Sequence, residues 1–174
     1  VYGTWNRAIK MSSGRFITNV NCDDRRAKDG LEIQAKNLII REDTDLVYND
    51  SYVSHEPNVR WDDVVRDKAQ KYFFEKFSKE QLLRGNLPHN NPMWRRELHE
   101  KNGFFEESYM SAGDWEFWLR CAFAGSKFLK IRNVLGVYFY NPDGISTNKA
   151  TTQSKIKEEV SVYKKYQKMY MKRE

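Results

Sequence analysis

The stretch Arg15-Phe16-Ile17-Thr18-Asn19-Val20-Asn21-Cys22-Asp23-Asp24 decides the fold. Apolar and polar residues alternate over its first six positions, which predicts a strand, and a helical pattern begins a few residues after it. Asn21, Asp23 and Asp24 therefore stand where a strand ends, the edge at which open α/β sheets bind ligands. A carboxylate pair beside phosphate oxygens is a common way to hold Mg²⁺ or Mn²⁺. Taken alone, however, these residue types favour an ordinary turn or helix N-cap.

Length and composition indicate a single folded domain. The chain has 174 residues, of which 14% are aromatic, enough for a substantial core. No apolar run approaches the roughly 20 residues of a membrane span, and no secretory signal pattern is present. The net charge of +6 favours anionic partners without choosing among them. Cys22 and Cys121 stand in different contexts and do not suggest a disulfide framework, so we expect a reduced, cytoplasmic setting.

The order of predicted elements is that of an α/β protein. We expect Leu31, Ala35, Leu38 and Ile39 to form the buried face of the second helix. The predicted elements are a helix over 1–13, strand 15–20, helix 27–41, strand 45–53, a long loop or insertion with a short strand over 54–77, a short helix between the cap Ser78 and Gly85, helix 93–101, helix 114–124, strands 127–131 and 134–140, and a final helix over 152–172.

The helix over 114–124 is apolar on most sides and is therefore expected to be buried. Its first residue, Asp114, stands beside Trp115, and partial desolvation would raise the proton affinity of the carboxylate. Such a group can act as a general base. The alternative is an N-cap, with Glu116 favoured by the helix dipole in the first turn.

Other polar features carry weaker signals. Arg95 and Arg96 could pair with phosphate or belong to a solvated helix face. The three histidines are isolated and are assigned no site. The final helix carries lysines on one side and an apolar stripe on the other, which predicts a solvated face or contact with an anionic membrane surface. Because the aromatic residues fall at core spacing, a nucleic-acid partner is not expected. The stripe consists of Ile156, Val160, Tyr163, Tyr166 and Tyr170.

Four segments together resemble the family-two glycosyltransferases of the GT-A fold. They occur in the family's order across most of the chain and cover residues 14–24, 45–50, 93–108 and 113–120. The resemblance implies an α/β, GT-A-like mixed sheet flanked by helices. Residues 1–151 would form this core and residues 152–174 a basic amphipathic helix.

The resemblance also implies an activity and a set of site residues. A sugar would pass, with inversion, from a nucleotide-diphosphate donor to a glycan or lipid-linked acceptor, as in cell-surface polysaccharide biosynthesis. The enzyme would be cytoplasmic or peripheral to a membrane. Asp114 would be the general base, and Asp23, Asp24 and Asn21 would bind Mn²⁺ or Mg²⁺ at the donor diphosphate. Asn6 would also approach the donor, and the acceptor would meet Trp94, Arg95, Trp115 and Glu116.

The chain departs from the family pattern in three ways. Asn21 stands where the family usually has its first aspartate, and Gly113 stands where many members carry glutamate. The opening strands that hold the nucleobase have no counterpart here. We therefore expect a fold that is incomplete at its N-terminus and that binds nucleotide sugars weakly on its own. The alternative function is a non-catalytic GT-A-like module that binds a glycan or a partner. The enzymatic interpretation requires the acidic corner, residues 21–24, to face Asp114 across one pocket.

Overall fold

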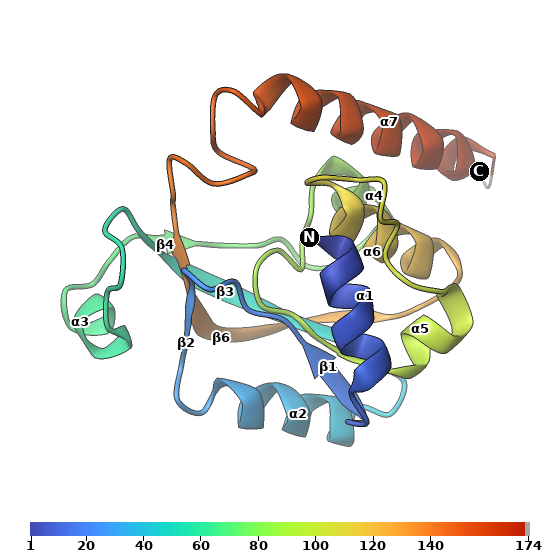
Figure 1. Ribbon diagram of the computed structural model, residues 1–174. Coiled ribbons are helices and arrows are strands. Elements are labelled where there is room, and N and C mark those ends of the chain that lie inside the picture. The colour runs from blue at the N-terminus through green and yellow to red at the C-terminus, as the bar shows by residue number, and fades with distance from the viewer. Residues whose placement is uncertain (173–174) are drawn as a thin grey trace.

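The computed structural model describes residues 1–172 as a mixed sheet with helices on both faces (Figure 1). Strands β3 and β6 pair in parallel, and the remaining pairings are antiparallel. This arrangement confirms the predicted α/β fold with a mixed sheet flanked by helices. The strand order is β1 (Phe16–Thr18), β5 (Met93–Arg95), β3 (Leu46–Ser54), β6 (Phe128–Phe139) and β2 (Arg25–Arg26), and β4 (Lys71–Tyr72) pairs with β3 outside this order.

The helices divide between the two faces of the sheet. In Figure 1, α2 (Gly30–Ile40) covers one face, and α7 (Thr152–Met171) lies outermost on the other side, against α4 and α6. Helix α3 (Trp61–Arg66) stands apart from both layers. The helices beneath α7 are α1 (Tyr2–Met11), α4 (Lys79–Arg84), α5 (Glu97–Asn102) and α6 (Gly113–Phe123).

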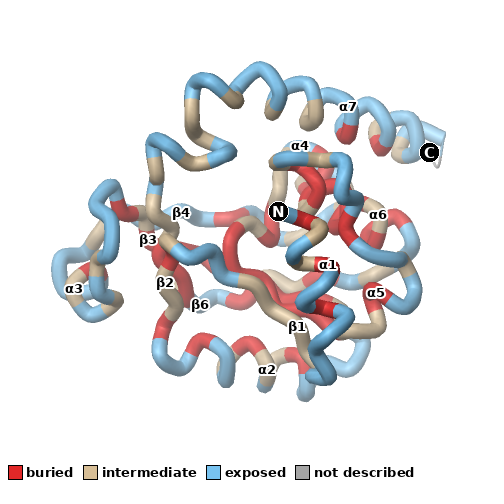
Figure 2. Tube along the Cα trace, in the orientation of Figure 1, coloured by how far each residue is buried: buried red, intermediate tan, exposed pale blue. Residues whose placement is uncertain are grey.

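Helix α6 is the centre of the hydrophobic core. Nine of its 11 residues are buried, as the sequence predicts for a helix that is apolar on most sides. Figure 2 shows the same concentration of burial in α6 and in the central strands. Trp118 contacts Trp94 edge to face, with ring centroids 5.1 Å apart. This contact packs the middle of α6 against β5, one turn beyond Asp114 in the first turn of the helix.

Residues 93–101 do not form the single helix that the sequence predicts. Met93–Arg95 is strand β5, inserted between β1 and β3, and the helix begins only at Glu97. The hydroxyl of Thr18 donates to the carbonyl of Pro92 at 2.6 Å, and this bond holds the strand's entry. Pairing on both sides overrides the local preference for helix. The predicted strands 127–131 and 134–140 are likewise one strand, β6, whose pairing with β3 is irregular near Asp50.

The buried face of α2 also differs from the prediction. Leu31 and Ile39 are exposed, whereas Gln34 is completely buried beside Leu38. The Gln34 amide donates to Asn49 Oδ1 at 2.9 Å and to the Asn91 carbonyl at 2.7 Å. A buried amide with these partners is stable in the interior. The hydrogen bonds of Gln34 therefore determine which side of α2 faces the sheet.

Helix α7 buries only part of the predicted stripe, together with Val162, which the stripe did not include. Val162 and Tyr166 are buried, and Tyr170 packs against the core, whereas Ile156, Val160 and Tyr163 are exposed. The last two residues of the predicted segment 152–174, residues 173 and 174, lie outside the described residues.

The cap predicted at Ser78 is confirmed, because its side chain accepts the Gln81 N–H at 3.0 Å. The stretch 54–77 holds α3 and β4.

His99 of α5 is built into the core. Its Nε2 accepts the indole N–H of Trp94 at 3.0 Å, and its Nδ1 lies 3.0 Å from the Gly103 carbonyl. Its ring stacks on Phe117 at 4.7 Å. These partners require the neutral ring with the proton on Nδ1. Burial lowers the pKa of His99 from 6.5 to about 4.

This depressed pKa predicts a loss of stability in mild acid. The unfolded chain binds a proton near pH 6.5 and the folded protein only near pH 4, so stability falls as the pH drops through that window. The loss from this group should be about 3 kcal/mol at pH 4. Urea denaturation of His99→Gln, which removes the titration, should show a shallower decline with pH than wild type. The control His55→Gln should keep the wild-type decline, and parallel curves for wild type and His99→Gln would contradict the assignment.

Candidate active site

A cavity of about 700 Å³ opens where the end of β6, the acidic corner and the first turns of α1, α6 and α7 come together. Asn21, Asp23 and Asp114 all line it. The corner and the start of α6 are separated by some 90 positions in the chain, yet they face one pocket. This is the arrangement that the enzymatic interpretation of the sequence requires.

Asp24 forms the buried support of the corner and does not line the cavity. Its carboxylate accepts the Phe139 N–H at 2.9 Å, the Asn21 amide at 3.0 Å and the Asn90 amide at 3.3 Å. Burial raises the pKa of the Asp24 carboxyl, and these hydrogen bonds act against that effect. The predicted metal and donor role of Asp24 is therefore not matched by its position, since its oxygens are engaged within the protein.

Asp23 and Asn21 are the corner residues presented to the cavity. The Asp23 carboxylate accepts from the Asn141 amide at 3.3 Å. The amide nitrogen of Asn21 is used by Asp24, which leaves its carbonyl oxygen as the atom able to bind a cation. The corner thus offers one carboxylate and one amide oxygen. Among residues 1–172, no group of three or more His, Cys, Asp or Glu side chains could hold a metal by itself.

Asp114 lies on the opposite wall, in the first turn of α6. Its Oδ1 accepts the Tyr2 hydroxyl at 3.1 Å, and its Oδ2 accepts the Asn86 amide at 2.7 Å. Burial raises the pKa of the Asp114 carboxyl. A partly buried carboxylate with raised proton affinity, open to a cavity, is suited to accept a proton from a bound hydroxyl.

The start of α6 is held from outside by α7. The Glu158 carboxylate accepts the backbone N–H groups of Met110, Ser111 and Ala112, at 2.7, 2.8 and 3.1 Å. A carboxylate at the N-terminal end of a helix also suits the helix dipole. The position of Asp114 therefore depends on a residue of the final helix.

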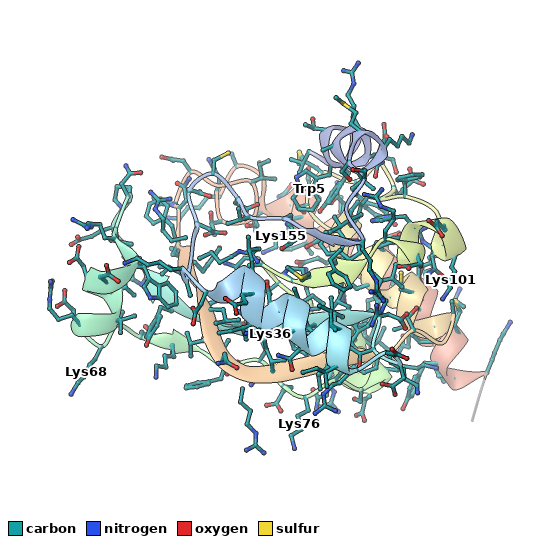
Figure 3. All side chains as sticks on the ribbon, turned by 90° about the horizontal axis from the view of Figure 1, so that it is seen from below. Trp5, Lys36, Lys68, Lys76, Lys101 and Lys155 are labelled. Carbon is teal, nitrogen blue, oxygen red and sulfur yellow. The ribbon has the colours of Figure 1, made fainter. Side chains whose placement is uncertain are left out.

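Several cavity residues carry no recognisable signal in the sequence. His89 lies within a group of aromatic rings that includes Tyr72, Phe74 and Tyr138, and burial lowers its pKa. Trp5 of α1 and Lys155 of α7, both labelled in Figure 3, line the same cavity. The Lys155 ammonium donates to the Ser146 carbonyl at 2.9 Å. The sequence gives one indication of this part of the cavity, which is the group of asparagines Asn86, Asn90 and Asn91 in a short connection.

The structure does not bring Asn6 to the cavity. Its amide donates to the Phe105 carbonyl at 2.8 Å and to Glu107 at 2.9 Å, and its carbonyl oxygen accepts the Phe105 N–H. Asn6 is buried. It therefore ties α1 to the segment that precedes α6, and the predicted donor contact is not matched by its position.

The four predicted acceptor residues are also buried away from this cavity. Trp94 donates to His99 and borders a separate groove of about 180 Å³ beside α1, and the Trp115 indole donates to the Leu82 carbonyl at 2.7 Å. The Arg95 guanidinium donates to the carbonyls of Thr44 and Leu38. Glu116 accepts from Arg120, Lys165 and Tyr166. These contacts belong to the core, and the tryptophan that lines the cavity is instead Trp5.

Comparison with known proteins shows which proteins share this fold. No protein-family model matches the chain. The chain is 25% identical over 134 residues to an uncharacterized glycosyltransferase of Methanocaldococcus jannaschii, covering 76% of this chain and 44% of that protein. Among solved structures, TarS 1–349 of S. aureus in complex with UDP-GlcNAc superposes with a TM-score of 0.61 at 17% identity, covering 81% of this chain and 39% of that one.

A second solved structure agrees. The mannosyltransferase PcManGT of Pyrobaculum calidifontis, in complex with GDP-Man and Mn²⁺, superposes with a TM-score of 0.56 at 17% identity, covering 83% of this chain and 37% of that one. The chain thus has the fold of glycosyltransferases. It spans about two fifths of the length of these proteins.

The two aspartates of the corner should differ sharply in their effect on stability. Asp24→Ala removes a buried carboxylate and leaves the Phe139 N–H without its partner, so the free energy of unfolding should fall by about 2 kcal/mol or more. Asp23→Ala, at the cavity wall, should change it by less than about 0.5 kcal/mol. Urea denaturation of the two variants measures this contrast. Equal losses would show that Asp24 does not support the corner.

Proposed function

We propose that this chain carries the catalytic pocket of a glycosyltransferase that moves a sugar from a nucleotide-diphosphate donor to an acceptor hydroxyl. One observation carries the proposal: Asp23 of the corner and Asp114 of α6 face the same cavity of about 700 Å³. The fold shared with glycosyltransferases supports it. The relatives solved with UDP-GlcNAc and with GDP-Man support a nucleotide-sugar donor of this general class.

In the proposed reaction Asp114 is the general base. Its carboxylate takes the proton from the acceptor hydroxyl while that oxygen forms a bond to the anomeric carbon of the donor. The bond from this carbon to the diphosphate oxygen breaks, and the diphosphate leaves with the electron pair. Attack opposite the leaving group inverts the configuration. The raised proton affinity of Asp114 favours the transfer of the proton.

Asp23 and Asn21 are the proposed ligands of Mn²⁺ or Mg²⁺. A carboxylate and an amide oxygen suit a hard divalent cation when diphosphate oxygens and water complete its coordination. When bound, such a cation offsets the charge that develops on the leaving diphosphate. The relative solved with GDP-Man and Mn²⁺ supports this cation class. Asp24 serves this site indirectly, because it holds Asn21 in place.

The proposal is tested by Asp114→Asn in the full-length protein. The amide keeps the size of the side chain but cannot accept the proton, so sugar transfer should fall on the order of 100-fold or more. Binding of the donor with Mn²⁺, measured by calorimetry, should be unchanged. The matched control Asp62→Asn, on the exposed surface of α3, should transfer at the wild-type rate.

Two outcomes would contradict the proposal. Undiminished transfer by Asp114→Asn would remove this residue as the base. A wild-type protein that binds a glycan but transfers no sugar with any nucleotide sugar would instead favour the non-catalytic, glycan-binding module.

We also propose that α7 contacts an anionic membrane surface, where a lipid-linked acceptor would be available. Ile156, Val160 and Tyr163 are exposed at helical spacing, and Figure 2 shows most of α7 as exposed. Both acidic side chains of α7 are engaged elsewhere: Glu158 at the start of α6 and Glu159 at the cavity. Lysines therefore dominate the charge beside the apolar stripe, and these are Lys157, Lys164 and Lys168. Among the described residues, no helix is long and apolar enough to cross a bilayer.

Co-sedimentation with vesicles tests this contact. The protein should bind vesicles rich in phosphatidylglycerol, bind phosphatidylcholine vesicles weakly, and lose binding as salt is raised. Replacing Ile156, Val160 and Tyr163 with serine should reduce binding to anionic vesicles at least about tenfold. The control Ile40→Ser removes an even more exposed apolar side chain, on α2, and should bind as wild type does. Equal binding by the triple variant would overturn the assignment.

A further inference from the structure

We propose that Asn86 and Tyr2 are positioning residues that hold the Asp114 carboxylate in one orientation for the acceptor hydroxyl. This inference rests on the proposed function. The Tyr2 hydroxyl donates to Oδ1 at 3.1 Å and the Asn86 amide donates to Oδ2 at 2.7 Å, so each carboxylate oxygen has its own donor. Two donors on two different oxygens fix the plane of the carboxylate. Each oxygen can accept more than one hydrogen bond, so the acceptor hydroxyl can still be bound.

The two donors come from separate elements, and each is held rigidly. Tyr2, the first residue of α1, packs edge to face on Trp5 at 5.4 Å and stacks on Phe105 at 5.8 Å. Its ring also covers Gly113, where a Cβ atom would lie only 2.6 Å from the ring. The glycine therefore makes room for the phenol directly beside the base.

Asn86 lies in the connection between α4 and β5. Its side-chain oxygen accepts the His89 N–H at 3.4 Å, which leaves the amide nitrogen directed at Asp114. The same connection is tied to the acidic corner, because Asn90 donates to Asp24. The support of the corner and the orientation of the base thus share one segment of chain.

Neither donor can replace Asp114 as the proton acceptor. The amide of Asn86 does not titrate, and burial raises the pKa of the Tyr2 phenol well above its usual range. Both donors stabilise the charged carboxylate, whereas burial favours its protonated form. The balance between burial and these two hydrogen bonds sets how readily Asp114 takes a proton. Removing a donor should therefore raise its pKa.

Other titratable groups face the cavity and must stay constant in any comparison. They are the Val1 amino group, Asp23, His89, Tyr138, Tyr140, Asp143, Lys155 and Glu159. Neither substitution changes these side chains, but Asn86→Leu also removes the acceptor of the His89 N–H, whereas Tyr2→Phe does not. A shift of the pH profile that both variants share then reports the lost hydrogen bond to Asp114.

The test uses Asn86→Leu and Tyr2→Phe in the full-length protein. The acid limb of kcat/KM for sugar transfer should move to higher pH by about one unit in Asn86→Leu and by less in Tyr2→Phe. The plateau kcat should fall about tenfold as the carboxylate loses its orientation, with KM for the donor unchanged. The control Asn37→Leu, on α2 and away from the cavity, should match wild type.

A second readout separates this inference from the proposed function. In protein carrying ¹³C-labelled aspartate, the carboxyl resonance that disappears in Asp114→Asn is that of Asp114, and its titration should move upward in both variants. This measurement needs no enzymatic activity, so it remains decisive if Asp114→Asn still transfers sugar. Tyr2→Phe removes one oxygen and keeps the ring over Gly113, so it carries the test if Asn86→Leu does not fold. Titration and pH profiles identical to wild type would overturn the proposal.

Discussion

The buried carboxylate of Asp24 is the constraint on which the cavity depends. It joins three segments, since it accepts from Asn21 in its own turn, from Asn90 before β5 and from the Phe139 N–H at the end of β6. A buried carboxylate is costly unless its oxygens are hydrogen-bonded, so these segments must be in place together. Each of them also lines the cavity through Asn21 and Asp23, Asn86 and His89, or Tyr138 and Asn141. The site is thus assembled around an acid that does not face it.

Two further acids, Glu158 and Glu116, hold the opposite wall of the cavity in place. Glu158 of α7 binds the backbone before α6, and the buried Glu116 accepts from Lys165 and Tyr166 of α7. Glu116 is two positions from Asp114, which turns it about 200° around the helix axis. That rotation explains why neighbouring acids have different roles: Asp114 faces the cavity, while Glu116 ties α6 to α7. Burial of Val162 in place of Ile156, Val160 and Tyr163 follows from the same attachment.

The sequence predicted those parts of the fold in which local signals agree. The strand before the corner, the Ser78 cap and the buried helix after Asp114 all have patterns that their surroundings do not oppose. Strand β5 could not be predicted from local patterns, because residues 93–95 form a strand only through pairing with β1 and β3. The predicted acceptor residues lie in the core for a related reason, since an aromatic or arginine side chain next to a motif can equally face inward. Asn86 and Tyr2 are recognisable only from distances across the fold, at separations of 28 and 112 positions from Asp114.

Gly113 and the Tyr2 ring fit one another at the start of α6. The resemblance places a glutamate at this position in many members, but here even a Cβ atom would collide with the ring of Tyr2. The volume is occupied by a phenol that donates a hydrogen bond to Asp114. A second carboxylate beside Asp114 would raise its proton affinity, whereas a neutral donor lowers it. Burial of Asp114 works in the opposite direction and keeps its pKa raised. Gly113 and Tyr2 are therefore coupled, because the small residue admits the side chain that supplies a neutral donor at this position.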